Sequence, residues 1–295
     1  METVASMTII TENFLAFLKE TAPDLALTTL EIGARKMEGQ TEPFHALIST
    51  LPNAKLVGFE PDEYACKELN QDSSDQFSYY PTALSNKQGT APFYETVHPM
   101  CSSLYEPNAP FLKRYNGMEV AELQTVTELS TTTLDQFMSE NPGNPADFIK
   151  IDVQGAELDI FQGGLQALKD VLFIVTEVEF VELYHGQPLF GDVSSFLQKQ
   201  GFMFHKFLEL GGRKLKPITL GGNVNTATQH LWGDAIFIRD LNQFDNFTSE
   251  QLLITGALAF VYNSPDLTHL CLANYEKLNP GSNLAEPFLK IITAS

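Results

Sequence analysis

Three short segments of the sequence place an acidic residue or a glycine where a predicted β-strand ends. They are residues 31–34 (EIGA), 58–61 (GFEP) and 149–157 (IKIDVQGAE). In an open parallel sheet, ligands bind beyond the carboxyl ends of the strands, at the point where the strand order reverses. We therefore take these three segments as the first candidates for a functional site.

The first two segments have the residue types of a nucleoside-binding site. Gly33 predicts a tight turn that lets a cofactor approach the backbone without meeting a Cβ atom. Glu60 follows Gly33 by 27 residues, close to where doubly wound folds place a carboxylate that binds both hydroxyls of a ribose. The alternative for Glu60 is a solvated acid before the turn at Pro61.

The third segment gathers charges at one strand end. Lys150 and Asp152 lie on one face of the predicted strand, and Glu157 begins the next helix. Charge clusters at strand ends are often functional. The alternatives are that Asp152 caps the helix, that Lys150 only pairs with acids, and that Glu157 only interacts with the helix dipole.

Further acids follow on a later strand. Glu177 and Glu179 share one strand face, where they could bind acceptor hydroxyls, or join Asp152 in holding a divalent cation of the Mg²⁺ kind. The alternative is that this strand has already emerged into solvent, and we assign no residue as a metal ligand. His185 follows the strand, so Asp152, Glu177 and His185 are the candidates for a general base. His230 is a further histidine that could reach the site.

Predicted strands and helices alternate along most of the chain. Such alternation indicates right-handed crossovers and a doubly wound, mostly parallel α/β sheet of the Rossmann-like kind. In the predicted helix 155–168, Gly163 and Gly164 indicate close backbone approach. The expected strands cover residues 27–32, 55–59, 77–84, 147–153 and 171–178, and the expected helices cover 41–51, 62–70, 155–168 and 193–200.

The remaining segments predict additions to this sheet. We expect one domain over residues 1–240, with an N-terminal helix within 1–26, a final strand at 235–239, and an insertion near the site at 86–130. Strand pairs are expected in the insertion at 89–97 and 120–129. Residues 241–295 predict a C-terminal helical appendage, with a capping box at Thr248 and Gln251 and a helix start at Ser264-Pro265. Homo-oligomer formation through these helices is possible.

Composition limits the partners. The formal charge is −19, from 37 acidic and 18 basic residues, which disfavours nucleic acids and anionic lipids but tolerates a neutral saccharide or a cationic cofactor. Cys66, Cys101 and Cys271 predict neither a disulfide framework nor a zinc site. No signal peptide or membrane span is predicted, so we expect a cytoplasmic protein.

Together with residues 83–85 (ALS) and 133–135 (TLD), the three segments resemble the FkbM-type methyltransferase family over roughly residues 28–205. The resemblance implies S-adenosylmethionine as cofactor, S-adenosylhomocysteine as product, and a hydroxyl of a saccharide, glycan or other natural product as acceptor. It implies the following cofactor-binding residues: Glu31, Gly33, Ala34, Glu60, Pro61, Ala83, Leu84, Ser85 and Asp152.

By position, the resemblance implies that Gly33 lies under the methionine part, Glu60 holds the ribose, Ser85 lies near the adenine and Asp152 faces the sulfonium. Two departures stand out: Glu31 replaces the usual Asp, and the turn at residues 35–39 is longer and more charged. They leave open an alternative, a protein that binds cofactor or glycan with weak or no catalysis. A nicotinamide dinucleotide is disfavoured, because the next glycine after Gly33 is Gly39 and no triple-glycine phosphate turn follows.

Overall fold

A seven-stranded sheet forms the centre of the computed structural model, which describes residues 2–293 except 36–40, 72–73, 144 and 224–226. Its order is β3-β2-β1-β7-β8-β10-β9. Neighbours from β3 to β8 pair in parallel, whereas β10 runs antiparallel to β8 and β9. The strands are β1 (Ala26–Ile32), β2 (Asn53–Phe59), β3 (Phe77–Tyr80), β7 (Phe148–Ile151), β8 (Phe173–Glu179), β9 (Phe202–Gly212) and β10 (His230–Arg239).

This topology confirms the predicted doubly wound, mostly parallel fold. The strand order reverses between β1 and β7, so the carboxyl ends of these two strands border the switch point where ligands bind in such sheets. Strand β9 is an addition that the sequence analysis missed.

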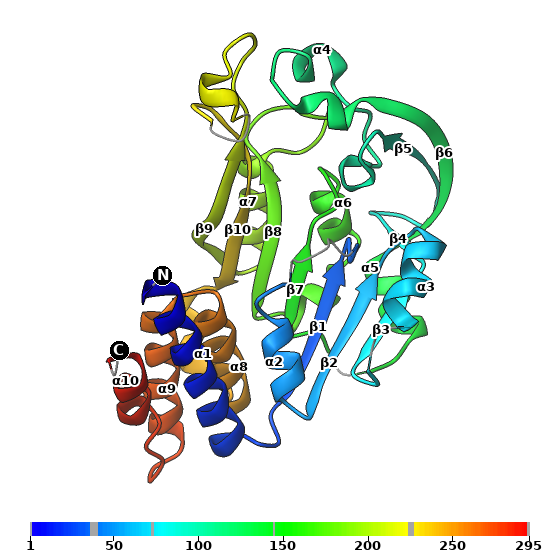
Figure 1. Cartoon of the computed structure of the whole chain (residues 1–295). Coiled ribbons are helices and arrows are strands. Elements are labelled where there is room, and N and C mark those ends of the chain that lie inside the picture. The colour runs from blue at the N-terminus through cyan, green and yellow to red at the C-terminus, as the bar shows by residue number, and fades with distance from the viewer. Residues whose placement is uncertain (1, 36–40, 72–73, 144, 224–226, 294–295) are drawn as a thin grey trace.

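Helices cover both faces of the sheet (Figure 1). Because side chains alternate along a strand, Phe148 packs with one helical layer and Ile149 with the other. The first layer holds α1 (Glu2–Thr21), α2 (His45–Thr50), α8 (Ser249–Val261), α9 (Pro265–Leu278) and α10 (Ala285–Thr293), and the second holds α5 (Leu134–Glu140), α6 (Glu157–Gln162) and α7 (Phe190–Lys199).

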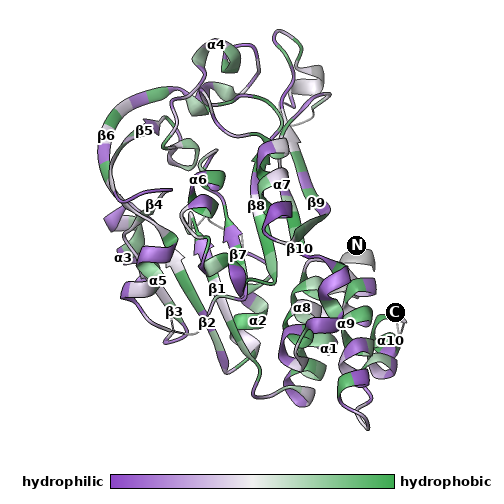
Figure 2. Cartoon of the chain, turned by 180° about the vertical axis from the view of Figure 1, so that it is seen from behind, coloured by the Kyte–Doolittle hydropathy of each residue, from purple (hydrophilic) through white to green (hydrophobic). Residues whose placement is uncertain are grey.

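The C-terminal helices are present as predicted, and they pack into the main core. Every residue from Leu252 to Phe260 of α8 is buried, and Figure 2 colours this helix as mostly hydrophobic. Phe14 of α1 stacks on Phe260 with ring centroids 3.8 Å apart, so the two ends of the chain meet in one helical layer. The capping box of Thr248 and Gln251 is formed as predicted.

The helix that follows Asp152 is shorter than predicted. It ends at Gln162 instead of continuing to 168, and Leu165 is 41% exposed. A Cβ atom on Gly163 would stand 2.3 Å from the carbonyl oxygen of Ser85. The glycine therefore permits the expected close approach, but it also ends the helix.

A second, three-stranded sheet projects from the domain. It has the order β4-β6-β5, from β4 (Ala83–Leu84), β5 (Gly89–Thr96) and β6 (Leu123–Thr132). Strands β5 and β6, with the segment between them that carries the short helix α4 (Ala109–Leu112), form what we call the arm, residues 89–132 (Figure 1). Within the described residues, none of the helices combines the length and the apolar character needed to cross a bilayer.

Candidate functional site

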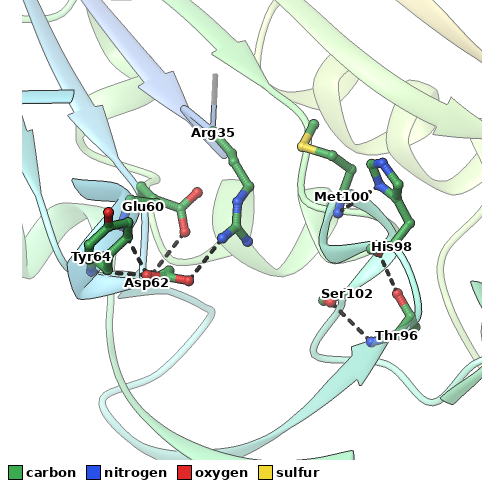
Figure 3. A network of polar contacts seen from close by, with 9 residues as sticks. Arg35, Glu60, Asp62, Tyr64, Thr96, His98, Met100 and Ser102 are labelled. Carbon is green, nitrogen blue, oxygen red and sulfur yellow. Dashed lines mark hydrogen bonds and ion pairs between the residues drawn. The ribbon is translucent and has the colours of Figure 1, made fainter. Parts of the chain in front are cut away.

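A cavity of about 720 Å³ opens at the carboxyl ends of β1, β2 and β7. Gly33, Glu60 and Asp152, one residue from each of the three segments singled out in the sequence, line this first cavity. The arm closes the opposite wall with side chains that include Phe93 and Met100. Figure 3 shows Glu60 and Met100 on the two sides of this opening.

The turn at Gly33 joins the ends of β1 and β2. The N–H groups of Gly33 and Ala34 both donate to the carbonyl oxygen of Phe59, at 3.0 Å each. Gly33 has φ +81°, and a Cβ atom here would stand 1.9 Å from the carbonyl oxygen of Asp152. Only glycine therefore fits between β1 and the end of β7.

Glu60 is a largely desolvated carboxylate in the wall of the first cavity. It is 4% exposed, and its Oε1 accepts a 2.9 Å hydrogen bond from the N–H of Asp62. Burial raises the pKa of Glu60, and the bond from Asp62 and the charge of Arg35 only partly oppose this effect. Among the described residues no hydrogen bond engages Oε2, so this atom is available to a ligand.

Arg35 forms an ion pair of 2.9 Å with Asp62 beside Glu60. Asp62 also accepts hydrogen bonds from the N–H groups of Ala65 and Tyr64, and these bonds together with Arg35 lower its pKa. In Figure 3, Arg35 reaches between the Glu60 turn and Met100. The sequence analysis did not predict this ion pair. The rest of the unusual turn, residues 36–39, lies outside the described residues.

A second cavity, of about 1240 Å³, adjoins the first and shares Gly33 and Asp152 with it. Glu31, Ala34 and Glu42 line it. Burial raises the pKa of Glu42 although nearby Lys150 opposes the shift. All of the predicted cofactor residues except Ser85 thus line one or both of the two adjoining cavities, and Gly33 and Asp152 line both.

Behind Asp152 lies a group of buried acids. Oxygen atoms of Asp152, Glu157 and Glu177 lie within 4.8 Å of one another. Glu157 accepts a 2.8 Å bond from the N–H of Val153, and burial raises its pKa to about 7. Burial, and then the charge of Asp152, raise the pKa of Glu177 well above its usual value.

Gln154 supplies a hydrogen-bond donor to these acids, a role that the sequence analysis did not assign. Its Nε2 donates to Asp152 Oδ1 at 2.9 Å and to Glu177 Oε2 at 2.5 Å. The side-chain amide therefore gives both carboxylates a donor, and we assign no metal there.

Lys150 forms an ion pair of 3.1 Å with Asp234 of β10. Burial alone would lower the pKa of Lys150, but Asp234 and Asp152 raise it overall. Lys150 therefore pairs with acids, as the alternative interpretation of this residue stated. Glu179 is 2% exposed and borders neither cavity, and burial raises its pKa well above the usual value.

Three predicted site residues border neither cavity. His185 is exposed, and its N–H donates to the carbonyl oxygen of Glu106, so the structure does not bring it to Asp152. Ser85 is buried, but its N–H donates to the carbonyl oxygen of Thr132. Its sequence neighbours Ala83 and Leu84 line the first cavity instead, as does the predicted residue Pro61. Glu177 also borders neither cavity, and it shares the amide donor of Gln154 with Asp152.

Comparison with known proteins identifies the family of this site. A family model described as the methyltransferase FkbM domain matches residues 31–204. The 2-O-methyltransferase NoeI of Sinorhizobium fredii is 32% identical over 144 residues, which are 46% of this chain and 58% of that protein. This chain thus spans less than two thirds of the length of that relative.

Solved structures with a similar fold are more distant in sequence. The FkbM methyltransferase of Methylobacillus flagellatus has 12% identity and a TM-score of 0.41, covering 72% of this chain and 43% of that chain. The magnesium protoporphyrin IX methyltransferase ChlM of Synechocystis has 9% identity and a TM-score of 0.35, covering 78% of each chain.

Proposed function

The chain belongs to the FkbM methyltransferase family, and we propose that it transfers a methyl group from S-adenosylmethionine to a hydroxyl group of a saccharide. The observation that carries this proposal is the meeting of Gly33, Glu60 and Asp152 in the wall of one cavity. These residues come from the ends of three neighbouring strands, where such sheets bind nucleosides.

The residues of the first cavity fit an adenosyl group. Its lining is mainly apolar with a few polar side chains, as is usual for small-molecule sites. Phe59, Leu84 and Ile160 supply apolar contacts for a base, and the buried Glu60 presents Oε2 as an acceptor for ribose hydroxyls. Bonds from two hydroxyls to a desolvated carboxylate would be charge-assisted and strong.

The second cavity fits the amino-acid end of the same molecule together with an acceptor. Glu31 and Glu42 line it, and their carboxylates can accept hydrogen bonds from an ammonium group or from hydroxyls. Asp152 borders both cavities, so its carboxylate lies where the two ligands would meet.

When bound, S-adenosylmethionine supplies a methyl group on a positively charged sulfur. The protein's part is to align the acceptor oxygen and to exclude water. Asp152 is the proposed general base, because this residue borders both cavities and a carboxylate can accept the hydroxyl proton. Glu177 lies behind Asp152 and supports it through Gln154, and His185 has no part in this proposal.

Two observations support a saccharide hydroxyl as the acceptor. The relative NoeI is named a 2-O-methyltransferase, which supports an oxygen atom as the acceptor. The formal charge of −19 and the acids of the second cavity disfavour phosphorylated acceptors.

The test is methyl transfer from labelled S-adenosylmethionine to neutral mono- and oligosaccharides, with sugar phosphates as a comparison. We expect label in neutral saccharides and matching formation of S-adenosylhomocysteine, and loss of both in Asp152→Asn. Wild-type turnover in Asp152→Asn would contradict the proposal that Asp152 is the general base. Binding of the methyl donor without transfer to any saccharide would contradict the proposed acceptor.

A further inference from the structure

The side chain of Gln154 joins two carboxylates through one amide group. Nε2 lies 2.9 Å from Asp152 Oδ1 and 2.5 Å from Glu177 Oε2. The opposite orientation of the amide would place its oxygen against two carboxylates, so the acids determine which way it points. The side-chain amide of Gln154 donates its hydrogen bond to Oδ1 of Asp152. Among the described residues no hydrogen bond engages Oδ2.

Gln154 is also held from the side of the arm. Ser103 Oγ donates to its backbone carbonyl oxygen at 2.7 Å. The hydroxyl of Tyr184 lies 3.0 Å from its Oε1 and 2.8 Å from the carbonyl oxygen of Cys101. Ser103 lines the first cavity with Gln154 itself, so the same residue contacts the acids and the closing wall.

The backbone of Gln154 has an unusual conformation. Its φ is +58°, in the left-handed region, and it is followed by Gly155 with φ +99°. The left-handed region is unfavourable for a non-glycine residue, and such residues persist where surrounding contacts fix them. A glycine would adopt this conformation more easily. The backbone geometry therefore does not account for a glutamine at this position, whereas the contacts of its side chain do.

We propose that Gln154 is a positioning residue, which fixes the Asp152 carboxylate through an amide shared with Glu177 and so presents Oδ2 to the ligands. The inference rests on the proposed function in one respect only, the identity of those ligands. The shared amide connects the ends of β7 and β8, and the contact with Ser103 ties this arrangement to the arm.

The first test uses ligand-free protein and the titration of its side-chain carboxyls. The ionisable groups around the amide are Asp152, Glu157, Glu177, Glu179, Asp234, Lys150 and Tyr184. Carbon-13 labelled Asp and Glu carboxyls are followed by NMR against pH, with Asp152→Asn and Glu177→Gln as assignment variants. Gln154→Gly keeps the backbone conformation accessible and removes the amide, so it separates positioning from folding.

We expect Gln154→Gly to fold and to shift the titration of Glu177 upward by about one pH unit, because a donor to its charged form is lost. The carboxyl-carbon resonance of Asp152 at neutral pH should also move, because the same amide donates to Asp152 Oδ1. An unchanged Glu177 midpoint or an unchanged Asp152 resonance in a folded Gln154→Gly would overturn the proposal.

A second measurement separates this inference from the proposed function. Calorimetry with S-adenosylmethionine, in two buffers of different ionisation enthalpy, counts the protons released on binding. We expect Gln154→Gly to change that count while altering affinity less than tenfold. If wild type binds no S-adenosylmethionine, the proposed function fails, whereas the ligand-free titration still decides the role of Gln154.

Discussion

The carbonyl oxygen of Asp152 lies 1.9 Å from the point where a Cβ atom on Gly33 would stand. This contact brings the end of β1 against the end of β7, at the boundary of the two cavities. The geometry of the site therefore requires that residue 33 has no Cβ atom.

Gly33→Ala should damage both folding and binding. The added methyl group meets backbone atoms, and φ +81° is unfavourable for alanine, so we expect a loss of about 2 to 4 kcal/mol in the free energy of unfolding. Urea denaturation measures this loss. Gly191→Ala is the matched control, because nothing lies within 4 Å of its Cβ position, and it should change stability by less than about 0.5 kcal/mol. Equal stability of the two variants would contradict this account of the turn.

Phe14→Ala tests whether the N-terminal and C-terminal helices belong to the main core. Phe14 is 1% exposed and stacks on Phe260, so we expect a loss of about 3 to 5 kcal/mol in the free energy of unfolding. Ile9→Ala on the same helix removes a side chain that is 57% exposed and should have little effect. A single cooperative transition, lowered only by Phe14→Ala, is the expected result; an unchanged transition would mean that α1 contributes nothing to the core.

Asp147 should make stability depend on pH. Burial raises its pKa from 3.8 to about 6, although the N–H of Thr28 donates to it at 2.8 Å. Because the folded-state pKa is the higher one, its stabilising contribution is complete below about pH 3.8 and is lost as pH rises through 6. Asp147→Asn should therefore gain about 1 to 3 kcal/mol over wild type at pH 7.5 and little at pH 4. Urea denaturation at both values checks this, and a gain of equal size at both would refute it.

Much of the fold could be predicted from the sequence, because buried parallel strands are short apolar runs. The runs predicted at 27–32, 55–59 and 147–153 correspond to β1, β2 and β7, although β7 ends at Ile151. Strand β9 was missed, since its pairing with β10 has irregular register and its alternation is correspondingly incomplete. The end of α6 was missed for a different reason: Gly163 was taken as a tolerated contact within a helix.

The candidate site was predictable where it depends on strand ends. Gly33, Glu60 and Asp152 follow from that rule alone. Gln154 and Tyr184 did not, because their roles depend on contacts between segments 30 residues apart in the chain. His185 is next to Tyr184 in sequence, yet it is Tyr184 that is buried and contacts Gln154; sequence position could not distinguish the two.

The central claim is that Glu60 holds the ribose of a bound adenosyl group. The most direct measurement is calorimetric binding of S-adenosylmethionine and S-adenosylhomocysteine to wild type, Glu60→Gln and Glu68→Gln. Glu68 is the control because it is exposed and lines neither cavity. We predict saturable binding to wild type and Glu68→Gln, and affinity about 10- to 100-fold weaker in Glu60→Gln, because the amide replaces a charged acceptor. Absence of saturable binding to wild type, or equal affinity in Glu60→Gln, would contradict the claim.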